Sequence, residues 1–109
     1  MKIIENAELL QYNTFRLHAK AKRLLVYDNL QELTDFLSEH KGEEILPIGQ
    51  GSNILFTRDF AGTVLVSDMK NVRYEGCFWT AESGVVMDEL IAQTLSAGHC
   101  GLENLSHIP

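Results

Sequence analysis

The sequence has few basic residues, few cysteines and no long apolar run. Nine lysines and arginines stand against fifteen aspartates and glutamates, so the 109 residues carry a net charge of −6. Nucleic acids and anionic membranes bind basic surfaces, so this composition argues against both as partners. No apolar stretch approaches the roughly 20 residues of a membrane span. Glu5 lies where a signal peptide would need its apolar core.

The small number of cysteines also limits the chemistry that we expect. Cys77 and Cys100 lack the paired spacing of a zinc site, and the four histidines are scattered, so we predict no metal site. We expect a cytoplasmic protein with reduced thiols. Apolar residues make up 45% and charged residues 22%, which is typical of a folded globular domain.

The first half of the chain predicts a strand–helix–strand unit within an α+β fold. A short apolar run over 23–27 suits a buried strand, and Asp28 or Asn29 is placed to cap a helix that follows it; Asn29 has capping-box spacing to Glu32. Leu33 and Phe36 fall on the apolar face of that helix. A second strand over about 44–48 then favours a parallel βαβ arrangement.

The remaining segments are assigned from their apolar patterns and turn residues. Residues 77–83 alternate in polarity, which favours a core position for Trp79, and Gly98 is placed to end the last helix. The segment 54–56 is either a third short strand or a core loop. We interpret 1–12 as a terminal arm, 59–62 as a turn, 63–67, 71–76 and 77–83 as strands, and 86–97 as a helix.

The segment PIGQGSNILF, residues 47–56, has the most distinctive chemistry. It lacks the lysine of a P-loop, and Ile54 stands where a dinucleotide-binding fingerprint has its third glycine. Two interpretations remain open. The residues Gly-Gln-Gly-Ser-Asn are good turn formers, and the same residues suit a nest of backbone N–H groups that binds an anion such as phosphate.

Four segments, in the same order, resemble the UDP-N-acetylenolpyruvoylglucosamine reductases, also called UDP-N-acetylmuramate dehydrogenases. These segments are YNTFRLHAKAKRLL (12–25), LPIGQGSNILF (46–56), DFAGTVLV (59–66) and SAGHCGLENLSHIP (96–109). The resemblance extends over residues 12–109. Two positions depart from the family pattern: Gln50 stands where many members have Gly or Glu, and Arg16 stands where a small residue is common.

The resemblance implies the N-terminal part of an FAD-binding domain of the vanillyl-alcohol-oxidase type, also called PCMH-type. It implies a first subdomain over about 20–70, the start of a second over about 71–109, and a substrate domain outside this chain. Pro109 would belong to a second flavin-contacting loop. The main chain that would hold the FAD pyrophosphate is that of Ile48, Gly49, Gln50, Gly51, Ser52 and Asn53.

The resemblance also implies a reaction in bacterial peptidoglycan precursor synthesis. In the family, NADPH reduces FAD, and the flavin passes a hydride to the nucleotide sugar UDP-N-acetylglucosamine enolpyruvate. The family's catalytic serine, arginine and glutamate would lie beyond Pro109, in the missing C-terminal half of the same protein. We therefore assign no catalytic residue and expect this chain to be inactive alone. Two alternatives stay open: the FAD-binding portion of another oxidase or dehydrogenase of the superfamily, and a non-catalytic module.

Overall fold

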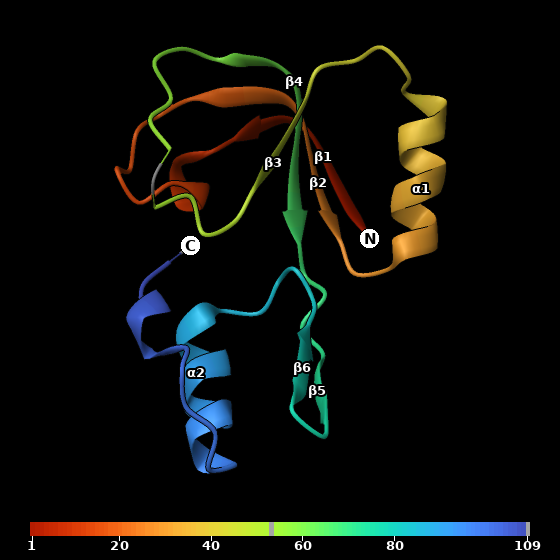
Figure 1. The fold of residues 1–109 in the computed structure, drawn as a ribbon. Helices are drawn as coiled ribbons and strands as arrows, with labels where there is room; N and C mark the ends of the chain where they lie inside the picture. Colours follow the sequence, from red (N-terminus) through yellow and green to blue (C-terminus); the bar gives the residue numbers. More distant parts are fainter. Residues whose placement is uncertain (53, 109) are drawn as a thin grey trace.

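The computed structural model describes residues 1–52 and 54–108, which form two sheets and two α-helices (Figure 1). None of the helices in these two ranges has the length and apolar character needed to cross a lipid bilayer. The elements are β1 (Lys2–Glu8), the 3-10 helix η1 (Leu10–Tyr12), β2 (Lys20–Tyr27), α1 (Leu30–Glu39), β3 (Ile45–Ile48), β4 (Phe60–Ser67), β5 (Val72–Glu75), β6 (Phe78–Ala81), α2 (Met87–Ser96) and the 3-10 helix η2 (Glu103–Leu105).

The larger sheet has the strand order β1-β2-β4-β3. Strands β2 and β3 both run parallel to β4, whereas β1 is antiparallel to β2. The predicted strand–helix–strand unit is therefore confirmed in direction, but β2 and β3 are not neighbours because β4 lies between them. The central position of β4 follows from its sequence: four successive residues, 62–65, are buried, as in a strand covered on both faces.

Both faces of this sheet are covered. Asn29 caps α1 as predicted, since its Oδ1 accepts hydrogen bonds from the backbone N–H groups of Gln31 (2.8 Å) and Glu32 (3.2 Å). On one face Phe36 of α1 packs with the buried side chains of β2 and β4. The other face carries the main core, which is formed by Ala7, Leu9, Ala21, Leu24, Ile48 and Val64. Ile54 and Phe56 pack against that core without forming a strand, so 54–56 is a core loop.

Two sequence-based predictions are wrong in this part of the chain. Residues 1–12 are not a loose arm, because β1 pairs with β2 along its length. Only Ala7 of β1 is buried, which explains why the apolar pattern was too weak to indicate a strand. The predicted turn over 59–62 is the start of β4. This strand has a glycine at position 62 because a Cβ there would lie 2.3 Å from the Glu44 carbonyl oxygen.

The rest of the chain forms a hairpin and a helix below the larger sheet in the view of Figure 1. Strands β5 and β6 pair antiparallel around Gly76, which has a φ of +61°. Helix α2 buries Ile91 and Thr94, and Gly98, with a φ of +80°, ends it as predicted. The division into subdomains near residue 70 remains a prediction.

Arg23 ties several elements of the larger sheet together. Its guanidinium donates to Glu5 Oε1 of β1 (2.9 Å), to Glu43 Oε2 (2.9 Å) and to Thr63 Oγ1 of β4 (3.3 Å). Partial burial would by itself raise the pKa of Glu43. The hydrogen bonds and charges of Arg23 and Lys22 together outweigh that effect and hold the pKa of Glu43 below its ordinary value. This ion-pair cluster therefore fixes the segment that leads into β3.

We expect the contribution of Glu43 to stability to disappear in acid. A carboxyl whose pKa is lowered by folding stabilises the protein above its unfolded pKa, about 4.3, and this contribution is lost as the pH falls through the folded pKa. Urea midpoints of the wild-type chain and of Glu43→Gln should therefore differ at neutral pH and converge in acid. A gap that stays constant across this pH range would contradict the assignment.

Candidate functional site

The glycine loop leaves the sheet at the carboxyl edge of its parallel strands. Ile48, the last residue of β3, is paired with Val66 near the end of β4. The segments that follow β3 and β4 therefore emerge side by side. In open sheets with parallel strands, ligands bind in the crevice beyond this edge. The topology thus places the loop where a ligand site is expected.

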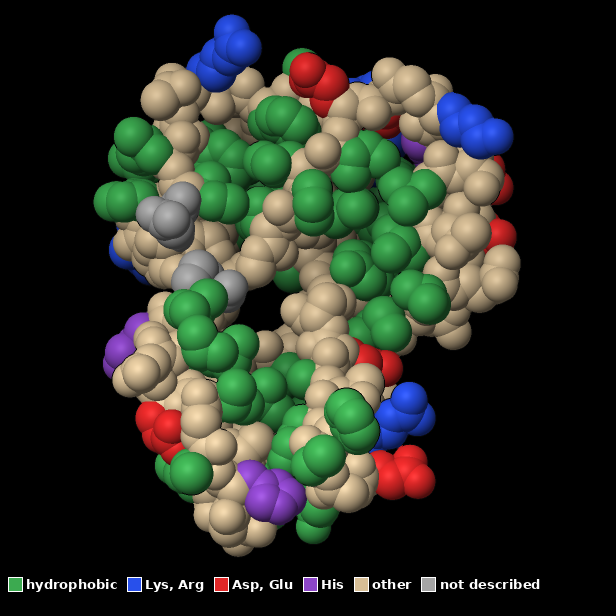
Figure 2. Space-filling view, in the orientation of Figure 1, with side chains coloured by type: hydrophobic (Ala, Val, Ile, Leu, Met, Phe, Trp, Pro, Cys, Tyr) green, Lys and Arg blue, Asp and Glu red, His purple; other side chains and the backbone are tan. Residues whose placement is uncertain are grey.

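A hollow of about 490 Å³ lies at this edge, and we call it the edge hollow. Figure 2 shows that the molecule is hollowed between the larger sheet and the part that contains α2. Four segments contribute to it: the loop after β3, the end of β4, the link from β6 to α2, and the C-terminal segment. Its lining residues are Ile48, Gly49, Gln50, Val66, Ser67, Asp68, Lys70, Ala81, Glu82, Ser83, Gly84, Val85, Val86, Met87, Leu90 and Ile108.

The structure brings together part of the predicted site. Ile48, Gly49 and Gln50 line the edge hollow; Ile48 is buried, whereas Gly49 and Gln50 are exposed to it. Ile108, the neighbour of Pro109, lines the same hollow. Gly51 and Ser52 are not among its described lining residues. Asn53 and Pro109 lie outside the described residues.

Gly51 turns inward and meets the fold itself. Its φ is +72°, and a Cβ at this position would lie 1.9 Å from the carbonyl oxygen of Tyr12. Its own carbonyl accepts a hydrogen bond from the backbone N–H of Thr14 (3.1 Å). The second glycine of the loop is therefore required by close packing against η1. The turn interpretation accounts for this glycine without any ligand.

The polar groups around the edge hollow are mostly hydrogen-bond donors or locally paired charges. Within the described residues, the backbone N–H of Gln50 donates none of the loop hydrogen bonds. The hydroxyls of Ser67 and Ser83 meet at 2.8 Å in the wall. Lys70 pairs with the nearby carboxylate of Asp68 at 3.1 Å. The arrangement suits an anion held chiefly by main-chain and hydroxyl donors.

Asp88, in the first turn of α2, holds the C-terminal segment in place. Its Oδ1 accepts hydrogen bonds from Ser106 Oγ (2.9 Å) and from the His107 backbone N–H (2.9 Å), and its Oδ2 lies 3.2 Å from His107 Nδ1. The backbone bond from His107, followed by the bond from Ser106, lowers the pKa of Asp88. These partners are distant in the sequence, so no local pattern predicts the contacts of Asp88.

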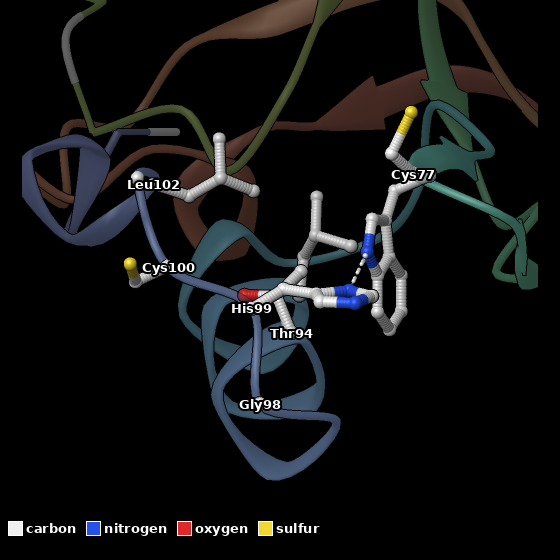
Figure 3. A pocket seen from close by; sticks show the side chains of 9 residues that line it. Cys77, Thr94, Gly98, His99, Cys100 and Leu102 are labelled. Atoms are coloured by element: carbon white, nitrogen blue, oxygen red, sulfur yellow. Dashed lines mark hydrogen bonds between the residues drawn. The ribbon is translucent and has the colours of Figure 1, made fainter.

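A larger hollow, of about 720 Å³, lies between the hairpin and the end of α2 (Figure 3). In its wall the indole N–H of Trp79 donates to His99 Nδ1 at 2.9 Å. Trp79 also stacks on Tyr74, with ring centroids 4.3 Å apart. Trp79 is only half-buried, so its predicted core position is wrong. None of the described residues of the predicted flavin site line this hollow, so the edge hollow is the better candidate. The residues that line this larger hollow are Cys77, Trp79, Leu90, Thr94, Gly98, His99, Cys100, Gly101 and Leu102.

We expect Gly51→Ala to be clearly more destabilising than Gly42→Ala. Both glycines have positive φ, but a Cβ at Gly42 would meet nothing within 4 Å. The left-handed backbone costs about 1–2 kcal/mol in either variant, and the contact with Tyr12 adds roughly 1–3 kcal/mol at position 51. Urea unfolding of the two variants measures the difference. Equal midpoints would show that the loop does not pack tightly against η1.

The comparisons with known proteins agree with the resemblance. No family model matches the chain. UDP-N-acetylenolpyruvoylglucosamine reductases from Flavobacterium johnsoniae, Azoarcus sp. and Alcanivorax borkumensis are 35%, 37% and 38% identical to it. The alignments cover 100%, 100% and 97% of this chain but only 34%, 35% and 32% of those proteins. The chain thus spans about a third of the length of the curated relatives that it matches.

A solved structure supports the fold. The crystal structure of UDP-N-acetylenolpyruvylglucosamine reductase from Thermus caldophilus matches 99% of this chain and 38% of that protein, with a TM-score of 0.70 and 22% identity. The mixed α+β fold is therefore shared with that enzyme. Together with the sequence matches, this shows that the chain is homologous to the UDP-N-acetylenolpyruvoylglucosamine reductases and corresponds to the N-terminal portion of these proteins.

Proposed function

We propose that this chain is the FAD-binding portion of a UDP-N-acetylenolpyruvoylglucosamine reductase, with a domain of the vanillyl-alcohol-oxidase type. The full-length protein would use NADPH to reduce UDP-N-acetylglucosamine enolpyruvate to UDP-N-acetylmuramate in the cytoplasm, as a step of peptidoglycan precursor synthesis. One observation carries the proposal. The loop that resembles the family's pyrophosphate loop opens into a hollow at the carboxyl edge of the parallel strands.

The residues around the edge hollow fit a diphosphate. Gly49 and Gln50 line the hollow, and a glycine lets the backbone approach a ligand closely. The N–H groups of this loop would act with the hydroxyls of Ser67 and Ser83 as donors. Ser52 and Asn53 would complete the proposed pyrophosphate site.

The charges of the edge hollow fit the same chemistry. Asp68 is paired with Lys70, and the Glu82 carboxylate accepts the backbone N–H of Asn71 at 2.7 Å. Both carboxylates are thus engaged by donors of their own. A diphosphate would then be stabilised by nearby backbone dipoles, a mode of binding that needs no strongly basic surface. This fits a protein with a net charge of −6.

Each part of the chain would have a role in holding the cofactor. The two proposed subdomains, over about 20–70 and about 71–109, each contribute residues to the lining of the edge hollow. Ile108, which lines the edge hollow, directly precedes Pro109 of the proposed second flavin loop in the sequence. Bound FAD would supply hydride transfer between NADPH and the nucleotide sugar. The residues of this chain would bind and orient it, while the catalytic groups would come from the rest of the full-length protein.

A charge placed in the wall of the edge hollow tests the position of the diphosphate. In the full-length protein, Ser67→Asp should weaken FAD binding at least about tenfold relative to Ser67→Asn, because the two side chains differ mainly by a negative charge. Either side chain can still accept the hydrogen bond that the backbone N–H of Met69 gives to Ser67. Titration of flavin fluorescence measures both affinities.

The matched control places the same charge elsewhere. Ser38→Asp on α1 should bind FAD like the wild type, because Ser38 is not among the lining residues of the edge hollow within the described part of the chain, and its hydroxyl donates to the Thr34 carbonyl of the same helix. Equal affinities for the two Ser67 variants would mean that the diphosphate does not lie in the edge hollow.

Activity tests the reaction itself. The full-length protein should oxidise NADPH in a manner that depends on UDP-N-acetylglucosamine enolpyruvate, and residues 1–109 alone should not. The measurement is the loss of NADPH absorbance with and without the sugar nucleotide. A flavoprotein that oxidises NADPH regardless of this substrate would favour another oxidase or dehydrogenase of the superfamily. Turnover by the 109-residue chain would contradict the absence of catalytic groups from it.

A further inference from the structure

The C-terminal segment reaches the edge hollow through a single anchoring side chain. In the described part of the chain, all hydrogen bonds that residues 105–108 make to other elements end on Asp88. The remaining bonds of this segment run between residues three apart, such as Ile108 N–H to the Leu105 carbonyl at 3.2 Å. The segment therefore depends on Asp88 for its position against α2.

We propose that Asp88 is a positioning residue of the flavin site, which holds the C-terminal loop against the edge hollow. The inference rests on the proposed function, because it assigns Asp88 to the cofactor site proposed above. Asp88 would not touch the cofactor. Asp88 would act through Ile108, which lines the edge hollow together with Gly49 and Gln50.

The backbone of His107 shows why such an anchor is needed. Its φ is +63°, a left-handed conformation that residues other than glycine and asparagine rarely adopt. The chain therefore needs an outside contact to hold this residue. Asp88 supplies this contact at two points: Oδ1 accepts a hydrogen bond from the backbone N–H of His107, and Oδ2 lies beside the ring nitrogen Nδ1 of His107. The hydrogen bonds from the His107 backbone and from Ser106 lower the pKa of Asp88, so the folded arrangement favours the ionised form, which accepts the stronger, charge-assisted bonds.

Glu89 offers a matched control for Asp88. It is the next residue of the same helical turn and carries the same charge, so it interacts in the same way with the helix dipole. Glu89 is exposed, and its carboxylate makes none of the described contacts with residues 105–108. A general effect of charge at the start of α2 would appear in both Asp88 and Glu89 variants, whereas a positioning effect would appear in Asp88 variants alone.

The experiment compares FAD binding by full-length proteins that carry Asp88→Ala, Asp88→Asn, Glu89→Ala or Ser106→Ala. We expect Asp88→Ala to weaken FAD binding about tenfold, since charge-assisted hydrogen bonds are lost. Asp88→Asn should be intermediate, because its amide oxygen can still accept from Ser106 and the His107 N–H. Glu89→Ala should match the wild type. At saturating FAD, the visible flavin spectrum should change in Asp88→Ala and stay unchanged in Glu89→Ala.

The possible outcomes separate this inference from the proposed function. If the wild type binds FAD while Asp88→Ala and Glu89→Ala have the same affinity and spectrum, the positioning role of Asp88 is wrong. If the wild type itself binds no FAD, the proposed function fails, and this inference fails with it. If Asp88→Ala does not fold, Ser106→Ala decides, because it removes one bond from an exposed loop. Ser106→Ala should weaken FAD binding about two- to fivefold, and an unchanged affinity would overturn the inference.

Discussion

The parallel pairing of β4 with both of its neighbours is the constraint on which the rest of the structure depends. Four buried residues in succession place β4 at the centre of the sheet, between β2 and β3. The register of Ile48 with Val66 then fixes how far the loop after β3 projects beyond the end of β4. A slip of one residue would turn the buried Ile48 away from the core. The edge hollow exists because this register brings two chain segments out of the sheet together.

Close backbone contacts then join the two parts of the chain around the edge hollow. A Cβ on Gly84 would lie 2.7 Å from the carbonyl oxygens of Ser67 and Met69, and the Gly84 N–H donates to the Met69 carbonyl at 2.8 Å. Gly51 packs still more closely against the main chain of Tyr12, since a Cβ there would lie 1.9 Å from the Tyr12 carbonyl oxygen. The glycines are thus needed for the fold before any ligand is considered. In this chain the glycines indicate where backbones meet, and the proposed ligand site lies beside these contacts.

The helix cap and the helix end were predicted correctly because each depends on residues that are close together in the sequence. Asn29 caps α1 through its own neighbours, and Gly98 ends α2 through its own φ, so both could be predicted from adjacent residues. The failures all involve partners distant in the sequence. The start of β4 was mistaken for a turn because the reason for Gly62 lies in Glu44. For the candidate site, the loop after β3 was predicted, whereas the role of Asp88 depends on Ser106 and His107, which no spacing rule connects to it.

The two departures from the family pattern become understandable in these terms. Gln50 is exposed at the edge hollow; in the proposed site a diphosphate would meet the main chain of this loop, which would leave the identity of the Gln50 side chain only weakly constrained. Arg16 has a φ of +53° and donates its backbone N–H to the Asn13 carbonyl at 3.2 Å. This left-handed conformation is least strained for glycine and is disfavoured for any residue that has a Cβ. Here the turn keeps the left-handed backbone and accepts an exposed arginine side chain, at a cost in backbone strain of about 1–2 kcal/mol. The proposed site, built largely from main chain, would therefore tolerate changes in side chain, provided that the backbone keeps its course.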